Sequence, residues 1–321
     1  MSARVGLMLC LLACLALAQE PPTPQQKQEV FDLSPHYTLG GELEGEATLN
    51  LDLTVRMQVA AKNIDHRTLQ AQEIVRRFRD TVAGVKGGKI AAVKRVYAEA
   101  YERQRMPGSR DYERLESPLH KRTLTIGLDS DGKREVSAEG EPALSARDTQ
   151  HEVHTERYEA ALPTEPVSVG DTWTVTGDRL RRAVGNGFGK EPVGQITCRF
   201  VEVKEENLDP ELVPDAEPQR YAIVQVDLET KARMGARDED PDMTCHLTGE
   251  LWFSLAERKL AKVELQGMAH VRSVEREVDV EVKITATGPL KINKRFWFPR
   301  KPEPPEQPPA DPGLPTPPER R

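Results

Sequence analysis

Strict alternation of apolar and polar side chains over residues 43–61 is the feature that most limits how this chain can fold. Successive side chains of a β-strand point to opposite faces, so the pattern predicts one very long strand, or two in line bent at Gly45. In a helix the same residues would place apolar groups around the whole circumference. One face of the strand is therefore apolar and the other polar. The apolar set is Leu43, Ala47, Leu49, Leu51, Leu53, Val55, Met57, Val59 and Ala61.

The C-terminal half predicts a meander of similar strands. In the last of them Val280, Val282 and Ile284 alternate with charged residues. Residues 122–138 add a hairpin, because Asp131-Gly132 supplies the positive torsions that a tight turn needs. The expected fold is mainly β, a long-stranded curved antiparallel sheet or half-barrel with minor helices. The expected C-terminal strands cover residues 193–204, 221–232, 243–255, 260–274 and 278–292.

Two stretches carry weaker patterns. Residues 63–106 fit two amphipathic helices, yet their Val, Ile, Phe and Tyr residues also suit edge strands, and we expect a mixture of helix and strand. Residues 145–162 are mostly polar with sparse apolar positions and predict a short surface helix. In the segment that follows, Trp173 is the expected anchor into a core.

The N-terminus predicts export. Arg4 precedes an apolar run that ends at the small residues Ala16-Leu17-Ala18, so residues 1–18 are expected to be a secretory signal peptide. A lipoprotein signal with an anchor at Cys14 is the alternative, although the apolar residues after Cys14 disfavour it. The rest of the chain has no second long apolar run, which predicts a periplasmic or extracellular protein without a transmembrane segment.

Composition divides the remainder into a body and two extensions. Residues 19–34 are rich in Pro, Gln and Glu and are expected to be a disordered leader. Residues 299–321 are rich in proline, which fixes its torsion and lacks an amide donor, and predict an extended, disordered tail. The β-domain between them covers residues 35–298, as one body or as two lobes, 35–140 and 160–298. The formal net charge of −7 argues against nucleic acid as a partner.

Two cysteines remain after the expected signal peptide. Cys198 and Cys245 both lie in apolar registers of expected strands, where an oxidising compartment would allow a disulfide between neighbouring strands. Two buried free thiols are the alternative. Two cysteines alone do not make a metal site.

Catalytic and ligand-binding motifs are weak. The sequence His151-Glu152-Val153-His154 lacks the spacing of a helical zinc-protease site, and a polar helix surface is the favoured interpretation. Residues 185–190 are glycine-rich but miss the phosphate-loop spacing, and the acidic residues 238–242 lack the ordered ligands of a calcium loop. We therefore expect no catalytic residues, no metal, no cofactor and no enzyme activity.

The order of several short motifs resembles a group of uncharacterised secreted β-rich proteins from planctomycete-like bacteria. These motifs are Ser117-Pro118-Leu119, the Pro-Val-x-Val-Gly-Asp-x-Trp sequence of residues 166–173, residues 249–253 and Leu265-Gln266-Gly267. These motifs mark turns and strand ends and contain no active-site residues. The layout is also similar to the half-barrels of periplasmic lipoprotein carriers (LolA-like) and, less closely, to lipocalins. That resemblance implies a curved sheet whose concave face holds an acyl chain, but fold does not fix function.

Two functional hypotheses follow. A packed core is the usual fate of an apolar face, so an envelope-associated binding or scaffold protein comes first, with an envelope protein as its partner. A carrier or sensor of a lipid or other hydrophobic ligand is the alternative, and it predicts an apolar surface open to solvent. The oligomeric state is not set by the sequence. The expected ligand-lining residues are Leu49, Leu51, Leu53, Val55, Met57, Val280, Val282 and Ile284.

Overall fold

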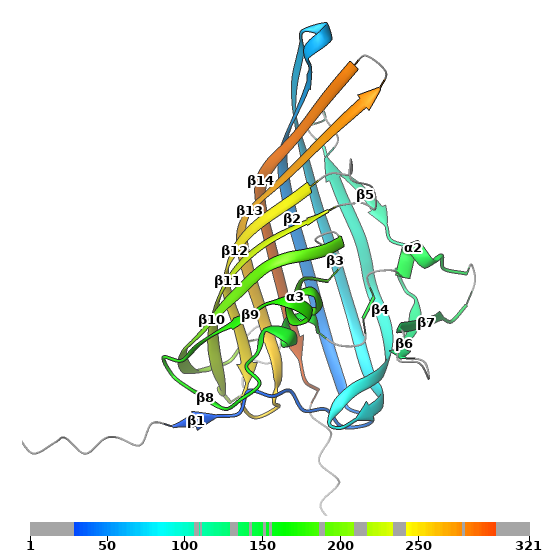
Figure 1. Cartoon of the computed structure of the whole chain (residues 1–321). Helices are drawn as coiled ribbons and strands as arrows, with labels where there is room; N and C mark the ends of the chain where they lie inside the picture. Colours follow the sequence, from blue (N-terminus) through cyan, green and yellow to red (C-terminus); the bar gives the residue numbers. More distant parts are fainter. Residues whose placement is uncertain are drawn as a thin grey trace, which may run out of the picture.

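The computed structural model shows one large curved antiparallel sheet with little helix (Figure 1). It describes residues 29–299 apart from 106–108, 110, 129–133, 141–142, 150–151, 154–155, 186–189, 209–216, 234–241 and 278–279. The expected signal peptide, most of the leader and the proline-rich tail lie outside these residues, as do the Asp131-Gly132 turn and most of the glycine-rich and acidic loops. The mainly β, curved-sheet prediction is confirmed.

Twelve strands form this sheet, in the order β7-β6-β4-β3-β2-β14-β13-β12-β11-β10-β9, with β5 beside β4. The two ends of the order, β7 and β9, do not meet, so the sheet is open. Its strands are β2 (Glu42–Val59), β3 (Ile64–Lys86), β4 (Lys89–Arg105), β5 (Glu113–Glu116), β6 (Thr123–Leu128), β7 (Arg134–Ala138), β9 (Thr172–Val175), β10 (Lys190–Glu206), β11 (Gln219–Arg233), β12 (Asp242–Ser254), β13 (Lys259–Glu277) and β14 (Val280–Trp297).

Short elements complete the chain. A two-stranded sheet pairs β1 (Val30–Phe31) with β8 (Val167–Ser168). The helical elements are η1 (Ala60–Lys62), α2 (Ala146–Thr149), η2 (Arg157–Ala161) and α3 (Gly177–Val184). The first and last long strands, β2 and β14, are hydrogen-bonded neighbours, so residues 35–140 and 160–298 share one sheet.

The expected strands of the C-terminal half and the long strand β2 are confirmed within a few residues at their ends. The helices expected within residues 63–106 are wrong, because β3 and β4 occupy almost the whole segment as paired strands. The helical spacing of the apolar residues in β4 arises from its bulge opposite Arg77 and Phe78, where Ala98 is the extra residue and shifts the alternation by one. In β3, which pairs with β2 without a register shift, apolar residues such as Val75 and Phe78 lie on opposite faces.

Glycines let the sheet bend. Gly194, Gly249, Gly267 and Gly288 occupy positions in β10, β12, β13 and β14 that face the concave side. A Cβ atom at Gly288 would lie 1.7 Å from the carbonyl oxygen of Asp52, and one at Gly267 would lie 1.9 Å from that of His246. Only glycine allows the neighbouring backbone to approach this closely, and such kinks curve a sheet sharply.

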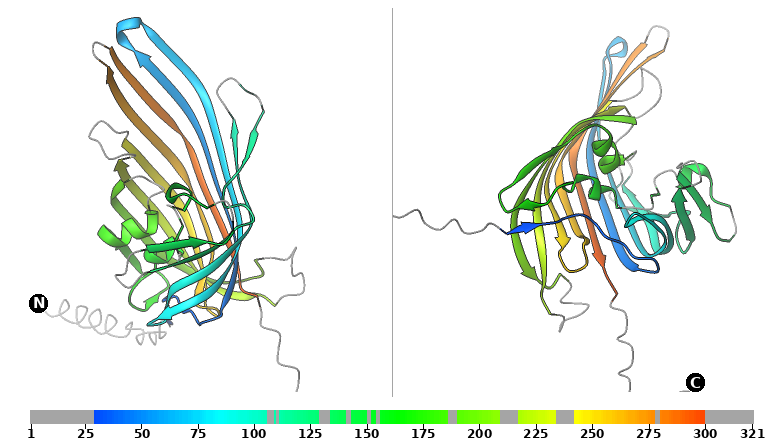
Figure 2. Two further views of the ribbon diagram at one scale, coloured as in Figure 1. Left: turned by 90° about the vertical axis from the view of Figure 1, so that its right-hand side faces the viewer. Right: turned by 60° about the horizontal axis from the view of Figure 1, so that its bottom comes forward.

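The lower half of the concave side is a filled core; "lower" here means the end with the β3–β4 turn, and "upper" the end with η1 (Figures 1 and 2). Leu180 and Val184 of α3, with Tyr158 of η2, pack against Phe200, Leu247 and other fully buried side chains of the sheet. Trp173 also packs against this core, as expected, and its indole donates to the carbonyl of Ala161 at 2.7 Å.

Residues 32–41 form a strap that closes the lower end. The backbone amide of His36 donates to the Arg258 carbonyl at 2.9 Å, beside the β12–β13 turn, and that of Tyr37 donates to the Gly88 carbonyl at 3.2 Å, at the β3–β4 turn. The strap therefore joins strands that lie far apart in the sheet order. The leader boundary expected at Ser34 is too late, because Phe31 and Leu33 are already buried in the core and Phe31 stacks edge-on against Phe200.

Candidate functional site

The apolar concave side continues above the filled core. On β2, Leu53, Val55 and Met57 follow Leu51 in the same register, and their partners on β14 include Ala286 and Ile284. We call this surface the upper apolar face: Leu53, Val55, Met57, Val59, Val282, Ile284 and Ala286. Its members are aliphatic residues and one methionine. Among the described residues, none of these seven belongs to the filled core of the lower half or packs against it.

The eight expected lining residues divide into two groups. Leu49 and Leu51 pack against the main core, so they belong to the filled lower half. The side chains of Leu53, Val55, Met57, Val282 and Ile284 are half-buried and lie together on adjacent strands. Val280 begins β14, but the structure does not describe its side chain.

Polar side chains border the upper apolar face on one side. In the register of β2 and β3, His66 lies opposite Met57, Thr68 opposite Val55 and Gln70 opposite Leu53. These β3 residues therefore share the concave side with the apolar strip. His66 and Gln70 are exposed. A ligand with an apolar chain and a hydrogen-bonding end fits such a boundary. If only hydrocarbon covered the polar side chains of β3, they would lose their hydrogen bonds to water.

A small cavity lies lower down, between the strap and the sheet. Tyr37, Asp80, Arg95, Glu159 and Lys259 contribute to its wall, and its volume is about 30 Å³. That volume accommodates water-sized molecules but no acyl chain. The cavity is therefore not the site that the carrier hypothesis requires.

The side chains around this cavity have shifted acidities. Burial raises the pKa of the Glu159 carboxyl to about 8, although the Tyr37 hydroxyl that donates to it acts in the opposite direction. Burial also raises the pKa of Tyr37 and lowers that of Lys259. Glu159 is thus mostly protonated near neutral pH, and the Tyr37–Glu159 contact holds the strap to η2 without a net charge.

A buried charge cluster adjoins the cavity. Glu152 is 1% exposed and accepts from Arg76 at 2.8 Å, from Arg95 at 3.0 Å and from the Tyr97 hydroxyl. Arg95 also forms two 2.7 Å bonds with Asp80 and lies over the Phe78 ring. The arginine charges lower the pKa of Glu152 although burial alone would raise it. Each member is paired, which is typical of a structural network.

This cluster corrects the expectation for residues 151–154. Glu152 does not lie on a polar helix surface; it follows α2 and points into the sheet, whereas His151 and His154 lie outside the described residues. Sequence reasoning missed the cluster because its members come from β3, β4 and the segment after α2. No local spacing joins them.

The expected disulfide is not formed. Cys198 and Cys245 are both free and buried. They lie on β10 and β12 with β11 between them. Two strand spacings amount to about 10 Å, beyond the about 7 Å that a disulfide spans between Cα atoms. Burial raises the pKa of each thiol to about 12, so both are unreactive core residues.

Two further searches concern the described part of the chain alone. Within it, no three His, Cys, Asp or Glu side chains are grouped so as to hold a metal ion. None of its helices has the length and apolarity needed to cross a membrane.

Comparisons with known proteins give little guidance. No family model and no curated protein matches this chain. Among solved structures, one described as "lipid-protein interactions in lipovitellin" is similar over 83% of this chain and 26% of that chain, with 6% identity and a TM-score of 0.35. Our chain thus spans about a quarter of that protein's length. A TM-score this low supports no argument about ligand or function.

Proposed function

We propose that this protein is an exported binding protein that holds the hydrocarbon chain of an amphiphile against the upper apolar face. The observation that carries the proposal is the row of apolar side chains on β2 and β14 that continues beyond the filled core; Leu53, Val55, Met57, Val282 and Ile284 are half-buried, whereas Val59 and Ala286 are buried. The filled lower half is what the scaffold hypothesis predicts for the whole concave side. Its upper half instead has the property expected of a carrier, and binding rather than catalysis is the proposed role.

The size of the upper apolar face favours a single hydrocarbon chain over a protein partner. From Leu53 to Val59 the strand rises about 20 Å, and two strands give a strip about 10 Å wide. Its area of about 200 Å² is well below the about 800 Å² that each partner buries in a standard protein interface. An acyl chain is about 15 Å long, half the thickness of a bilayer core, and fits along the strip.

The polar border supplies the other half of the ligand. Thr68 and Gln70 of β3 lie beside the strip on the same concave side. A headgroup with hydrogen-bonding groups pairs with them while the chain covers Leu53 and Ile284. The proposed ligand is therefore an amphiphile such as a fatty acid or a lipid with one chain in contact.

Binding of cis-parinaric acid, a fluorescent fatty acid, tests this proposal on the purified chain. We expect saturable binding that Leu53→Asp or Ile284→Asp weakens by about tenfold or more, because a carboxylate then faces hydrocarbon. Thr54→Asp and Thr285→Asp are matched controls, since both residues are exposed on the opposite face of the same strands. These controls should bind as the natural protein does.

Native mass spectrometry of protein expressed with residues 1–18 provides the second readout. A stoichiometric, lipid-sized adduct that solvent extraction removes would support the proposal. Equal binding by Leu53→Asp and the natural protein, with both folded by circular dichroism, would contradict it. A clean ligand-free mass together with no parinaric acid binding would return the scaffold hypothesis to first place.

A further inference from the structure

Three arginines and two tyrosines gather where β5 pairs with the upper end of β4. Tyr101 lies opposite Glu116 and Arg103 opposite Arg114 in the register of the two strands. Arg105 follows Arg103 by two residues and so shares its face, and Tyr112 precedes Arg114 by two. This face of β4 is opposite to Glu102, which the concave-side Gln72 contacts at 2.6 Å. The cluster therefore lies on the convex side, behind the upper apolar face.

The guanidinium groups stack on the tyrosine rings. The Cζ atom of Arg114 lies 3.9 Å from the ring centroid of Tyr101 and that of Arg103 lies 5.5 Å from it. The Cζ atom of Arg105 lies 5.6 Å from the Tyr112 centroid. These cation–π contacts restrict the positions of the guanidinium groups.

Charge on this cluster is incompletely balanced. Arg103 pairs with Glu73 at 3.2 Å across an exposed contact, and Glu116 shares the face of Arg114. Among the described residues, neither Arg105 nor Arg114 has a carboxylate within ion-pair distance. Like charges placed directly opposite each other on paired strands are unfavourable. Arg103 and Arg114 nevertheless hold that arrangement. An anion that bridges them would relieve the repulsion.

Strand pairing brings these arginines close enough for one anionic group to contact two of them. Side chains directly opposite on paired strands are about 5 Å apart, and those two residues apart on one strand are about 6.6 Å apart. Phosphate and carboxylate groups are the anions that arginine side chains bind with paired hydrogen bonds. The Tyr112 side chain is 51% exposed and offers an aromatic face beside the cations. Acidic polymers of sugars present anions and flat ring faces together.

We propose that this Arg–Tyr surface binds an anionic glycan, whose acidic groups pair with Arg105 and Arg114 and whose sugar ring packs on Tyr112. The overall net charge of −7 repels any polyanion, glycan or nucleic acid alike, so attraction to this surface comes from the local charges of Arg105 and Arg114. The surface is independent of the upper apolar face and does not rest on the proposed lipid function.

Calorimetric titration of the purified chain with polygalacturonate tests this assignment, with dextran as a neutral glycan and polyglutamate as an anionic polymer without sugar rings. Polygalacturonate should bind and dextran should not. The double variant Arg105→Gln/Arg114→Gln should lose about tenfold or more in affinity, since two charge-assisted contacts disappear. Tyr112→Ala should weaken binding of polygalacturonate but not of polyglutamate.

Arg77→Gln/Arg79→Gln is the matched control. Both arginines lie on the convex side of β3 and change the net charge equally, but they are already paired with Glu46 and Glu44. The control should bind polygalacturonate as the natural protein does. Equal losses of affinity in the control and in the Arg105/Arg114 variant would overturn the proposal. It would also be overturned if polyglutamate and polygalacturonate bound equally well and Tyr112→Ala changed neither affinity. Undiminished binding by the Arg105/Arg114 variant would also overturn it.

Discussion

At the scale of single residues, Glu159 is a buried group whose ionisation affects the stability of the fold. Its carboxyl accepts from Tyr37 of the strap and lies near Lys259 in the cavity wall. Burial raises the pKa from its ordinary value of 4.5 to about 8, so folding favours the protonated form. The strap is held by a hydrogen bond to a neutral carboxyl, and ionisation of Glu159 would leave a charge buried at this contact.

Stability should therefore fall as pH rises through the range between these two values. Below pH 4.5 the Glu159 carboxyl is protonated in both folded and unfolded chains, and its contribution is fully present. As pH rises towards about 8 the unfolded chain releases the proton first, so the free energy of unfolding decreases by at most about 1.4 kcal/mol per pH unit. Urea denaturation between pH 5 and about 8.5 measures this slope.

Glu159→Gln keeps the shape of the protonated carboxyl and removes its titration. The variant should show a flatter pH profile and exceed the natural protein in stability near pH 8. Glu257→Gln is the control, because Glu257 is exposed and lies two residues from Lys259. Identical slopes for the natural protein and Glu159→Gln would show that Glu159 ionises freely in the folded state.

At the scale of elements, the glycines at the bend set the shape of the sheet. Gly288 of β14 should not tolerate alanine, because the added Cβ would lie 1.7 Å from the Asp52 carbonyl oxygen and force β2 and β14 apart. We expect a loss of more than about 3 kcal/mol in the free energy of unfolding. Gly84→Ala in β3 is the control, since its Cβ would meet nothing closer than 3.4 Å. Denaturant titration of both variants measures the difference, and equal stabilities would contradict this account of the bend.

The sequence predicts these elements unevenly. Strict alternation in residues 43–61 identifies β2, because its apolar side chains stay on the concave face and its polar side chains on the convex face along the whole strand. In β4 the bulge opposite Arg77 and Phe78 moves apolar residues to a helical spacing, and in β3 apolar residues lie on both faces, so the local pattern alone favours the wrong element. The role of Gly288 is equally hidden, since the steric need for glycine comes from Asp52 on another strand.

The candidate site was predictable in part. Leu53, Val55, Met57, Val282 and Ile284 are brought together as expected, because strands with one apolar face each must pair with those faces aligned. Leu49 and Leu51 instead join the core. Which part of an apolar face is covered depends on where α3 and η2 pack, and alternation within one strand contains no information about that.

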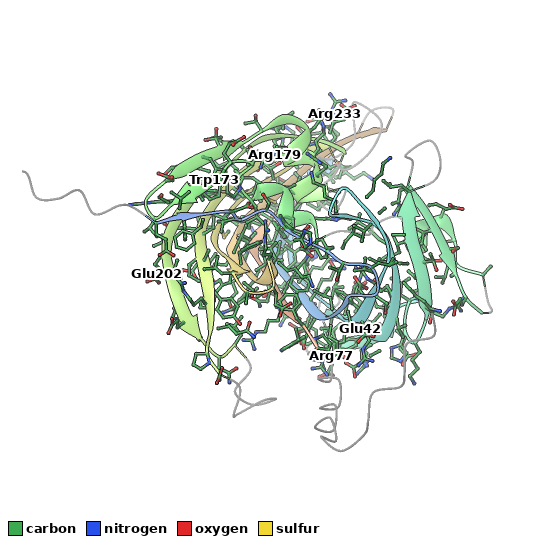
Figure 3. The ribbon with its side chains drawn as sticks, turned by 90° about the horizontal axis from the view of Figure 1, so that it is seen from below. Glu42, Arg77, Trp173, Arg179, Glu202 and Arg233 are labelled. Atoms are coloured by element: carbon green, nitrogen blue, oxygen red, sulfur yellow. The ribbon has the colours of Figure 1, made fainter. Side chains whose placement is uncertain are left out.

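At the scale of the whole molecule, the same long strands run from a filled core to a sparsely packed surface. The upper part of β14, around Val282 and Ile284, and the lower part, around Leu290 and Ile292, both pair with β13 and β2, so the two parts have similar backbone hydrogen bonds. Their side chains differ, because Leu290 and Ile292 are 3% and 5% exposed while Val282 and Ile284 are half-buried. Local opening of a strand depends on such packing, since each buried apolar side chain adds to its cost. Figure 3 views the curved sheet from below with its side chains drawn.

Hydrogen exchange should therefore divide individual strands. We expect amides of residues 282–286 to exchange about tenfold or more faster than those of residues 290–296 in the ligand-free protein, because opening the upper part exposes less apolar surface. Palmitate should slow exchange in the upper part alone, since a ligand that binds only the closed form stabilises the region it contacts. Mass-spectrometric exchange with and without palmitate measures both effects, and the Leu53→Asp variant should show no response to palmitate. Uniform protection along β14 in the ligand-free protein would mean that the upper apolar face is packed as firmly as the core. That surface would then be part of the packed structure and not a binding site for a hydrocarbon chain.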